Sequence, residues 1–187
     1  MSTTLIIVIV LAVLAVLLIG IYNRLVTLRT SCDQAFADVD VQLKQRHDLI
    51  PNLVETVKGY AAHEKETLEA VIQARNMATS AGNVEEQVQA ENFLTGALRQ
   101  LFALSEQYPD LKANQNFMQL QAEISDIENK LAAARRFFNS AVAEYNAGRE
   151  QFPAVVVAGA FGFTERTYFD LGDDQRASLD TAPNVSF

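Results

Sequence analysis

An uninterrupted apolar run near the N-terminus constrains this chain more than any other feature of its sequence. Residues 5–22 read LIIVIVLAVLAVLLIGIY and contain neither a charged side chain nor a proline. A helix of about 20 apolar residues spans the hydrocarbon core of a bilayer, and this run comes close to that length. The run therefore predicts a transmembrane helix that contacts membrane lipid, and we assign residues 1–23 to an N-terminal anchor.

The flanking residues favour an uncleaved anchor over a cleaved signal. A secretory signal begins with a basic segment and ends in small residues, whereas MSTT carries no charged side chain and residues 21–24 read IYNR. A lipoprotein signal ending at Cys32 is also disfavoured, because Arg29, Thr30 and Ser31 precede that cysteine.

Positive charge predicts the orientation of the anchor. Only the terminal amine precedes the apolar run, whereas Arg24 and Arg29 follow it closely. Cytoplasmic flanks of membrane helices are enriched in Lys and Arg. We therefore expect residues 24–187 in the cytoplasm and the N-terminus on the outer side.

Beyond the anchor, apolar residues recur in steps of three and four, which predicts an all-α bundle. The first stripe indicates a helix from about 24 to 78, in which Pro51 either kinks the helix or turns the chain. The unbroken register favours the kink. A second helix lies between short connections at 77–86 and 107–114, which make neighbouring helices antiparallel. A third, with apolar residues from Phe117 to Tyr145, shows the heptad spacing of coiled-coil packing.

The C-terminal region divides into an apolar segment and a polar tail. Residues 152–163 read FPAVVVAGAFGF, too short a run to span a bilayer. We expect a short docked helix or a membrane-facing segment there. The contact residues that we assign to it are Val155, Val156, Val157 and Phe161. Residues 24–169 then form the bundle, and the acidic residues 170–187 form a disordered tail.

Part of the first stripe lacks an obvious partner within the chain. The second and third helices reach only the membrane-distal half of the first, and a long apolar stripe does not stay exposed. Either the chain bends at Pro51 into a four-helix arrangement, or copies of the chain cover each other. We favour the second alternative. The residues predicted to form this subunit contact are Leu25, Leu28, Phe36, Val39 and Leu43.

Amide side chains near the stripes form a further candidate group. These residues are Gln42, Asn52, Asn114, Asn139 and Asn146. Buried amides must be hydrogen-bonded, and in coiled coils they fix register and partner number. We predict that they set the alignment of helices or subunits; the alternative is that they lie on the surface beside the stripe.

No constellation for catalysis or metal binding is visible within one helix. His47 and His63 lie roughly 24 Å apart along a helix, and Cys32 lies more than about 20 Å before His47. A metal site shared between subunits is the open alternative. We predict no metal and no cofactor, and His47 fits a helix-packing histidine with one hydrogen-bond partner. The formal net charge of −8 argues against a nucleic-acid surface.

Five stretches, in this order, resemble the LemA family of bacteria. They are IYNRLVTLR (21–29), DVQLKQRHDLIPNLVETVKGYAAHE (40–64), EQYPDLKANQNFMQLQAEI (106–124), RRFFNSAVAEYN (135–146) and FPAVVVAGAFGFTERTYF (152–169). The resemblance runs from the anchor to about Phe169 and leaves the acidic tail outside. It implies one membrane helix, a short outer N-terminus and a cytoplasmic antiparallel helical bundle. It implies no catalytic residue, and a relative of the family takes part in forming magnetosome membranes.

The sequence and the resemblance together favour a non-enzymatic function. We expect a scaffold that self-assembles at the cytoplasmic face of the bacterial inner membrane and organises membrane or partners. The alternative is a monomeric adaptor that holds a membrane protease or a sensor kinase. A metal-dependent enzyme is the third and least supported hypothesis.

Overall fold

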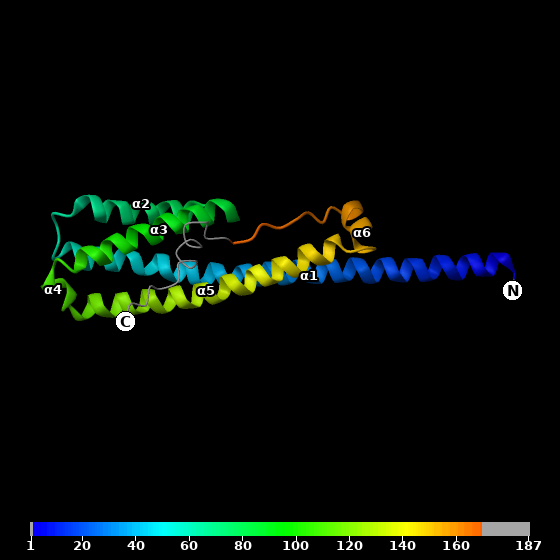
Figure 1. Cartoon of the computed structure of the whole chain (residues 1–187), viewed down its shortest axis with the longest axis horizontal. Coiled ribbons are helices and arrows are strands. Elements are labelled where there is room, and N and C mark those ends of the chain that lie inside the picture. The colour runs from blue at the N-terminus through cyan, green and yellow to red at the C-terminus, as the bar shows by residue number, and fades with distance from the viewer. Residues whose placement is uncertain (1, 170–187) are drawn as a thin grey trace, which may run out of the picture. The chain divides into compact units, whose positions relative to one another are not determined.

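The computed structural model describes residues 2–169, which form helices joined by short connections and contain no strand (Figure 1). The predicted all-α class is confirmed, as is the long apolar helix at the N-terminus. The helices are α1 (Thr3–Lys58), α2 (Lys65–Ser80), α3 (Val84–Ser105), α4 (Pro109–Lys112), α5 (Gln115–Glu150) and α6 (Ala154–Phe161). The predicted disordered tail lies outside the described residues.

The described residues fall into two compact units, and each is considered by itself. The anchor unit contains the chain up to Asp40 together with Ala133–Tyr168. The bundle unit contains Val41–Ala132 and Phe169. Helices α1 and α5 each contribute residues to both units.

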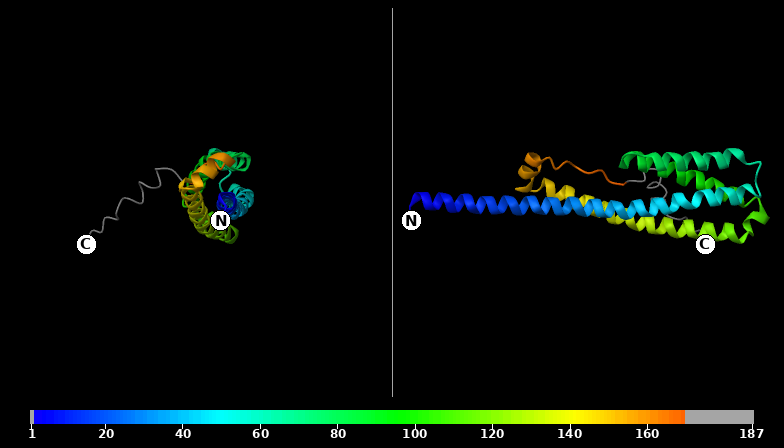
Figure 2. Two further views of the ribbon diagram at one scale, coloured as in Figure 1. Left: turned by 90° about the vertical axis from the view of Figure 1, so that its right-hand side faces the viewer. Right: turned by 180° about the vertical axis from the view of Figure 1, so that it is seen from behind.

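The bundle unit is built from four long helical segments and the short α4, with α2 and α3 packed side by side (Figures 1 and 2). One core receives apolar side chains from the end of α1, from α2, α3 and α4, and from the beginning of α5. Its largest members are Ile50, Leu53, Leu68, Leu94, Leu98, Leu101, Leu111, Phe117 and Ile124. Each such side chain contributes roughly 1.5–3 kcal/mol when it is fully buried.

The predicted continuous helix from 24 to 78 is wrong. Helix α1 does continue through Pro51, but it ends at Lys58, and the chain turns before α2 begins at Lys65. The turn opens at Gly59, where the amides of Tyr60 and Ala61 both bond the carbonyl of Val57. The four-helix alternative is therefore correct, although the chain turns after Gly59 and not at Pro51.

The other predicted helices and connections agree with the structure. Asn83 caps α3 by accepting a hydrogen bond from the amide of Glu86 at 2.9 Å. Pro109 begins the short α4, and Asn114 accepts a bond from the amide of Phe117 at 3.0 Å in the first turn of α5. Helix α5 passes Gly148 and stops at Glu150.

In the anchor unit, the second half of α5 lies along α1 (Figure 2). The rings of Phe36 and Phe138 pack 5.5 Å apart. Gly148 permits the close approach, because a Cβ atom there would lie only 2.8 Å from Cδ1 of Leu28. This side of α1 is therefore covered by the same chain.

The expectation that the first stripe lacks a partner within the chain is wrong. Leu25, Leu28, Val39 and Leu43 are all buried, and Phe36 is half-buried. Their burial in one chain removes the reason for assigning them to a contact between copies. By contrast, the apolar side chains of the span up to Ile19 are exposed on all sides, and the span is long and apolar enough to cross a membrane.

Candidate functional site

A charged cluster lies inside the bundle unit, centred on Arg46 of α1 and Glu91 of α3. Both side chains are almost completely buried, with relative exposures of 1% and 0%. The guanidinium of Arg46 donates to Glu91 at 3.0 Å, to the hydroxyl of Thr95 at 2.9 Å and to Glu128 of α5 at 3.0 Å. One arginine thus joins three helices of the bundle.

Glu91 accepts further hydrogen bonds through its second carboxylate oxygen. Nε2 of His47 lies 2.6 Å from Oε1, and the amide of Gln87 donates to the same oxygen at 3.2 Å. Burial of Glu91 by itself raises the pKa of this carboxyl. The hydrogen bond from His47 and the positive charges of His47 and Arg46 outweigh burial, so the pKa is lowered overall.

The neighbouring proline adds a second link between helices. A proline has no amide hydrogen, so Pro51 leaves the carbonyl oxygen of His47 without its usual helical donor. Nε of Arg75, on α2, donates to that oxygen at 2.8 Å. The segment Arg46–Pro51 therefore bonds α2, α3 and α5 at once.

The geometry of the charged cluster suits a role in holding the helices of the bundle unit together. Its charges oppose one another within the core, and the side chains of Arg46, His47 and Glu91 are buried. Among the described residues, no three His, Cys, Asp or Glu side chains are grouped so that they could hold a metal ion. Opposed and hydrogen-bonded charges of this kind rigidify a core and specify how its helices pack.

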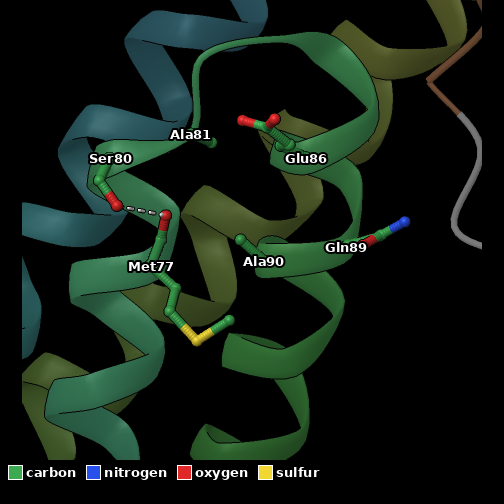
Figure 3. A pocket seen from close by; sticks show the side chains of 6 residues that line it. All are labelled: Met77, Ser80, Ala81, Glu86, Gln89 and Ala90. Atoms are coloured by element: carbon green, nitrogen blue, oxygen red, sulfur yellow. Dashed lines mark hydrogen bonds between the residues drawn. The ribbon is translucent and has the colours of Figure 1, made fainter.

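Three hollows on the bundle surface lie outside this cluster. One, of about 250 Å³, lies between α2 and α3; Figure 3 shows the side chain of Met77 lying between the two helices there, whereas Gln89 points away. A second, of about 330 Å³, lies between α1 and α2 and includes Leu68 and Ile72. A third, of about 380 Å³, lies between α1 and α5, and its Lys130 and Asp126 form an ion pair of 2.7 Å. None of the three is lined by Arg46, His47 or Glu91.

The sequence indicates one member of the cluster, His47, and does not indicate Arg46 or Glu91. The prediction that His47 is a helix-packing histidine with a hydrogen-bond partner is confirmed. Arg46 and Glu91 were missed, although each occupies an apolar position in the helical spacing. Arg46 lies three residues after Leu43, and Glu91 lies three before Leu94. The sequence signal for this ion pair was a basic residue at a core position of one helix and an acidic residue at a core position of another.

The candidate amides have different environments. Asn52 is exposed, whereas Gln42 and Asn139 are half-buried. Asn114 caps α5, as described above. Their role in setting register stays a prediction.

Asn146 is buried and holds the segment that follows α6. Its amide nitrogen donates to the carbonyl of Arg166 at 2.9 Å, and its oxygen accepts from the amide of Arg166 at 3.0 Å. The hydroxyl of Tyr145 donates to the carbonyl of Thr164 at 2.8 Å, and Arg166 pairs with Asp33 at 2.7 Å. Together these bonds fix residues 164–166 to both α1 and α5.

Helix α6 lies beside α1 at the end of α5 (Figure 1). Of its four candidate contact residues, Val157 is buried, whereas Val155, Val156 and Phe161 are exposed. The ring of Tyr22, at the end of the apolar run, contacts the rings of Phe161 and Phe163 at 5.1 and 5.6 Å. The inner face of α6 is thus packed within the anchor unit, and its outer face is open.

Comparison with known proteins agrees with this architecture. The chain is 27% identical over 169 residues to Protein LemA of Metamycoplasma hominis, a match that covers 88% of this chain and 75% of that protein. It is 24% identical over 174 residues to Magnetosome protein MamQ of Magnetospirillum gryphiswaldense and to Magnetosome protein MamQ 2 of Paramagnetospirillum magneticum. These matches cover 79% of this chain but only 64% of each relative, less than two thirds of its length. With the apolar N-terminal helix, the relatives indicate a membrane-associated helical protein.

The model of the LemA family matches residues 35–187. The match includes the acidic tail, so the expectation that the tail lies outside the family pattern is wrong. More than half of the sequence is covered, and the chain therefore belongs to the LemA family.

Proposed function

We propose that this protein is a non-enzymatic scaffold, anchored by a single helix in the bacterial inner membrane. Residues 5–22 cross the bilayer, the N-terminus is outside and the bundle is in the cytoplasm. One observation carries the proposal: the apolar side chains of the span are exposed in the single chain, and the same helix α1 continues into the packed core. An exposed apolar helix of this length requires lipid or another protein around it.

The packing of the bundle supports a scaffold. Arg46 and His47 of α1 both bond Glu91 of α3, and Arg46 also bonds Glu128 of α5; these bonds stiffen the junction of the three helices. The likeness to proteins named for the magnetosome supports a role in organising membrane.

We also propose that copies of the chain assemble, with the anchor helices as the contact surface. The stripe of α1 is already covered by the chain itself, whereas the span up to Ile19 is exposed on all sides. The mass of the full-length protein in native lipid discs tests this point. A defined mass above that of one chain supports assembly, and a clean monomer contradicts it.

A monomeric adaptor for a membrane protease or sensor kinase is the second candidate. The hollow between α1 and α2 favours it, because exposed Ile72 and buried Leu68 offer an apolar surface between charged rims. If a protein partner binds there, Ile72→Asp will release a partner that co-purifies in stoichiometric amount. The neighbouring exposed position provides the control, since Gln73→Asp will leave that partner bound.

A further inference from the structure

Helix α6 has no polar side. Residues 154–161 read AVVVAGAF, without a single polar side chain. One face is docked, since Val157 and Ala158 are buried. The opposite face is open, with relative exposures of 45% for Val155 and 63% for Val156. A helix at a water-exposed surface normally presents polar residues outward, and a helix that is apolar all round has apolar surroundings.

The apolar surface extends beyond α6 itself. Phe152, just before the helix, and Phe161, at its end, are among the most exposed aromatic side chains of the described residues. Single exposed apolar residues are common and need no explanation, but a contiguous apolar patch marks an interaction surface.

The position of α6 indicates what covers this patch. The ring of Phe161 lies 5.1 Å from that of Tyr22, so α6 lies level with the end of the apolar run. Tyrosine at that place is typical of the boundary between hydrocarbon and headgroups. Just beyond it, the guanidinium of Arg29 lies 5.2 Å from the ring centre of Phe163, and Arg24 is exposed. Apolar side chains level with the end of the run, followed by positive charge, match the layering of a bilayer surface.

We propose that α6 is an interfacial membrane helix, which inserts its open face into the leaflet through which α1 leaves the bilayer. The ligand is the phospholipid bilayer itself, and the inserting residues are Phe152, Val155, Val156, Ala160 and Phe161. This inference rests on the proposed function, because it requires residues 5–22 to cross the same membrane. Interfacial helices bury their apolar face about 5–10 Å into the headgroup and acyl boundary. The anchor unit then meets the membrane at two places, which fixes its orientation.

The absence of tryptophan from the sequence allows a direct test. Three full-length proteins with one tryptophan each are placed in lipid discs that contain phospholipids brominated at known depths: Val156→Trp, Leu14→Trp and Ser140→Trp. Leu14 lies in the apolar run, and Ser140 is an exposed residue of α5 in the anchor unit. We expect shallow bromines to quench the tryptophan at 156 most strongly and deep bromines to quench the one at 14. The tryptophan at 140 will respond only to aqueous acrylamide.

Each alternative outcome has a definite meaning. If acrylamide quenches the tryptophan at 156 as it does the one at 140, α6 faces water and the inference is wrong. If neither reagent reaches position 156, protein covers α6 and the inference is again wrong. If bromines fail to quench the tryptophan at 14, the run does not cross the membrane and the proposed function itself fails.

Discussion

The side chain of Arg75 donates through Nε to the carbonyl oxygen of His47 at 2.8 Å, the oxygen that Pro51 leaves without a helical donor. The bond runs from α2 to α1 and replaces the missing hydrogen bond within α1. Helix α1 thereby tolerates a proline in its interior, and the freed carbonyl of His47 links α1 to the neighbouring helix α2 by a hydrogen bond.

This relationship predicts that Arg75 and Pro51 are energetically coupled. Arg75→Met leaves a carbonyl without a donor, and we expect a loss of about 1–3 kcal/mol in the free energy of unfolding. Pro51→Ala restores an amide hydrogen, so Arg75→Met will cost clearly less in that background. Denaturant unfolding of the four proteins, followed by circular dichroism, measures this double-mutant cycle. An equal cost in both backgrounds would show that Arg75 acts elsewhere.

Removing the charge of Glu91 will destabilise the bundle. Glu91→Gln leaves Arg46 buried without its full counter-charge, and we expect a loss of about 3 kcal/mol in the free energy of unfolding. Glu69, exposed on α2, is the matched control. Glu69→Gln will change stability by less than about 0.5 kcal/mol. Similar losses for the two variants would contradict the structural role of the cluster.

The difference in stability between the parent protein and the Glu91→Gln variant will also depend on pH. The folded structure lowers the pKa of Glu91, so its ionised form stabilises the fold above the usual glutamate range. That stability is lost as pH falls through the lowered pKa, because the carboxylate then takes up a proton. Unfolding measured at decreasing pH should therefore bring the stability of the parent protein towards that of Glu91→Gln. A constant difference down to strongly acidic pH would contradict the assignment.

We expect Asn146 to hold the C-terminal segment in place and to contribute little to the stability of the bundle unit. Asn146→Ala removes two hydrogen bonds to Arg166, each contributing about 0.5–1.5 kcal/mol. We expect faster amide hydrogen exchange at residues 164–167 and unchanged exchange in α2 and α3. Ser140→Ala, on the exposed face of the same helix, serves as the control and will leave the segment protected. Unaltered exchange in Asn146→Ala would show that other contacts hold the segment.

The helices were predictable from the sequence, but the turn after α1 was not. Helical spacing places Leu94, Leu98 and Leu101 on one face, and the structure buries all three. The apolar spacing did not reveal this turn, because buried Val57 and Ala61 keep a four-residue spacing across it. Apolar spacing therefore cannot distinguish a continued helix from a turn that packs into the same core.

The candidate sites were less predictable, because they depend on contacts distant in sequence. Helical spacing places Arg46 and Glu91 at core positions, but it does not show that these residues, 45 apart in sequence, form an ion pair with each other. Likewise, nothing near Leu28 in sequence indicates that Gly148 will allow another helix to cover it. Local periodicity identifies the faces of helices, whereas the partner of each face follows from the tertiary arrangement.

The burial of Val39 allows a final prediction that separates internal packing from assembly. Val39 is completely buried, whereas Val41, two residues along α1, is 51% exposed. Val39→Asp places an unpaired charge among apolar side chains, and we expect a loss of several kcal/mol in the free energy of unfolding with a fall in helix content. Val41→Asp carries the same change in charge and will leave helix content unaltered. Circular dichroism and the mass in lipid discs, measured on both variants, check this. A Val39→Asp protein that keeps its helix content but falls from an assembly to a single chain would place this residue at a contact between copies.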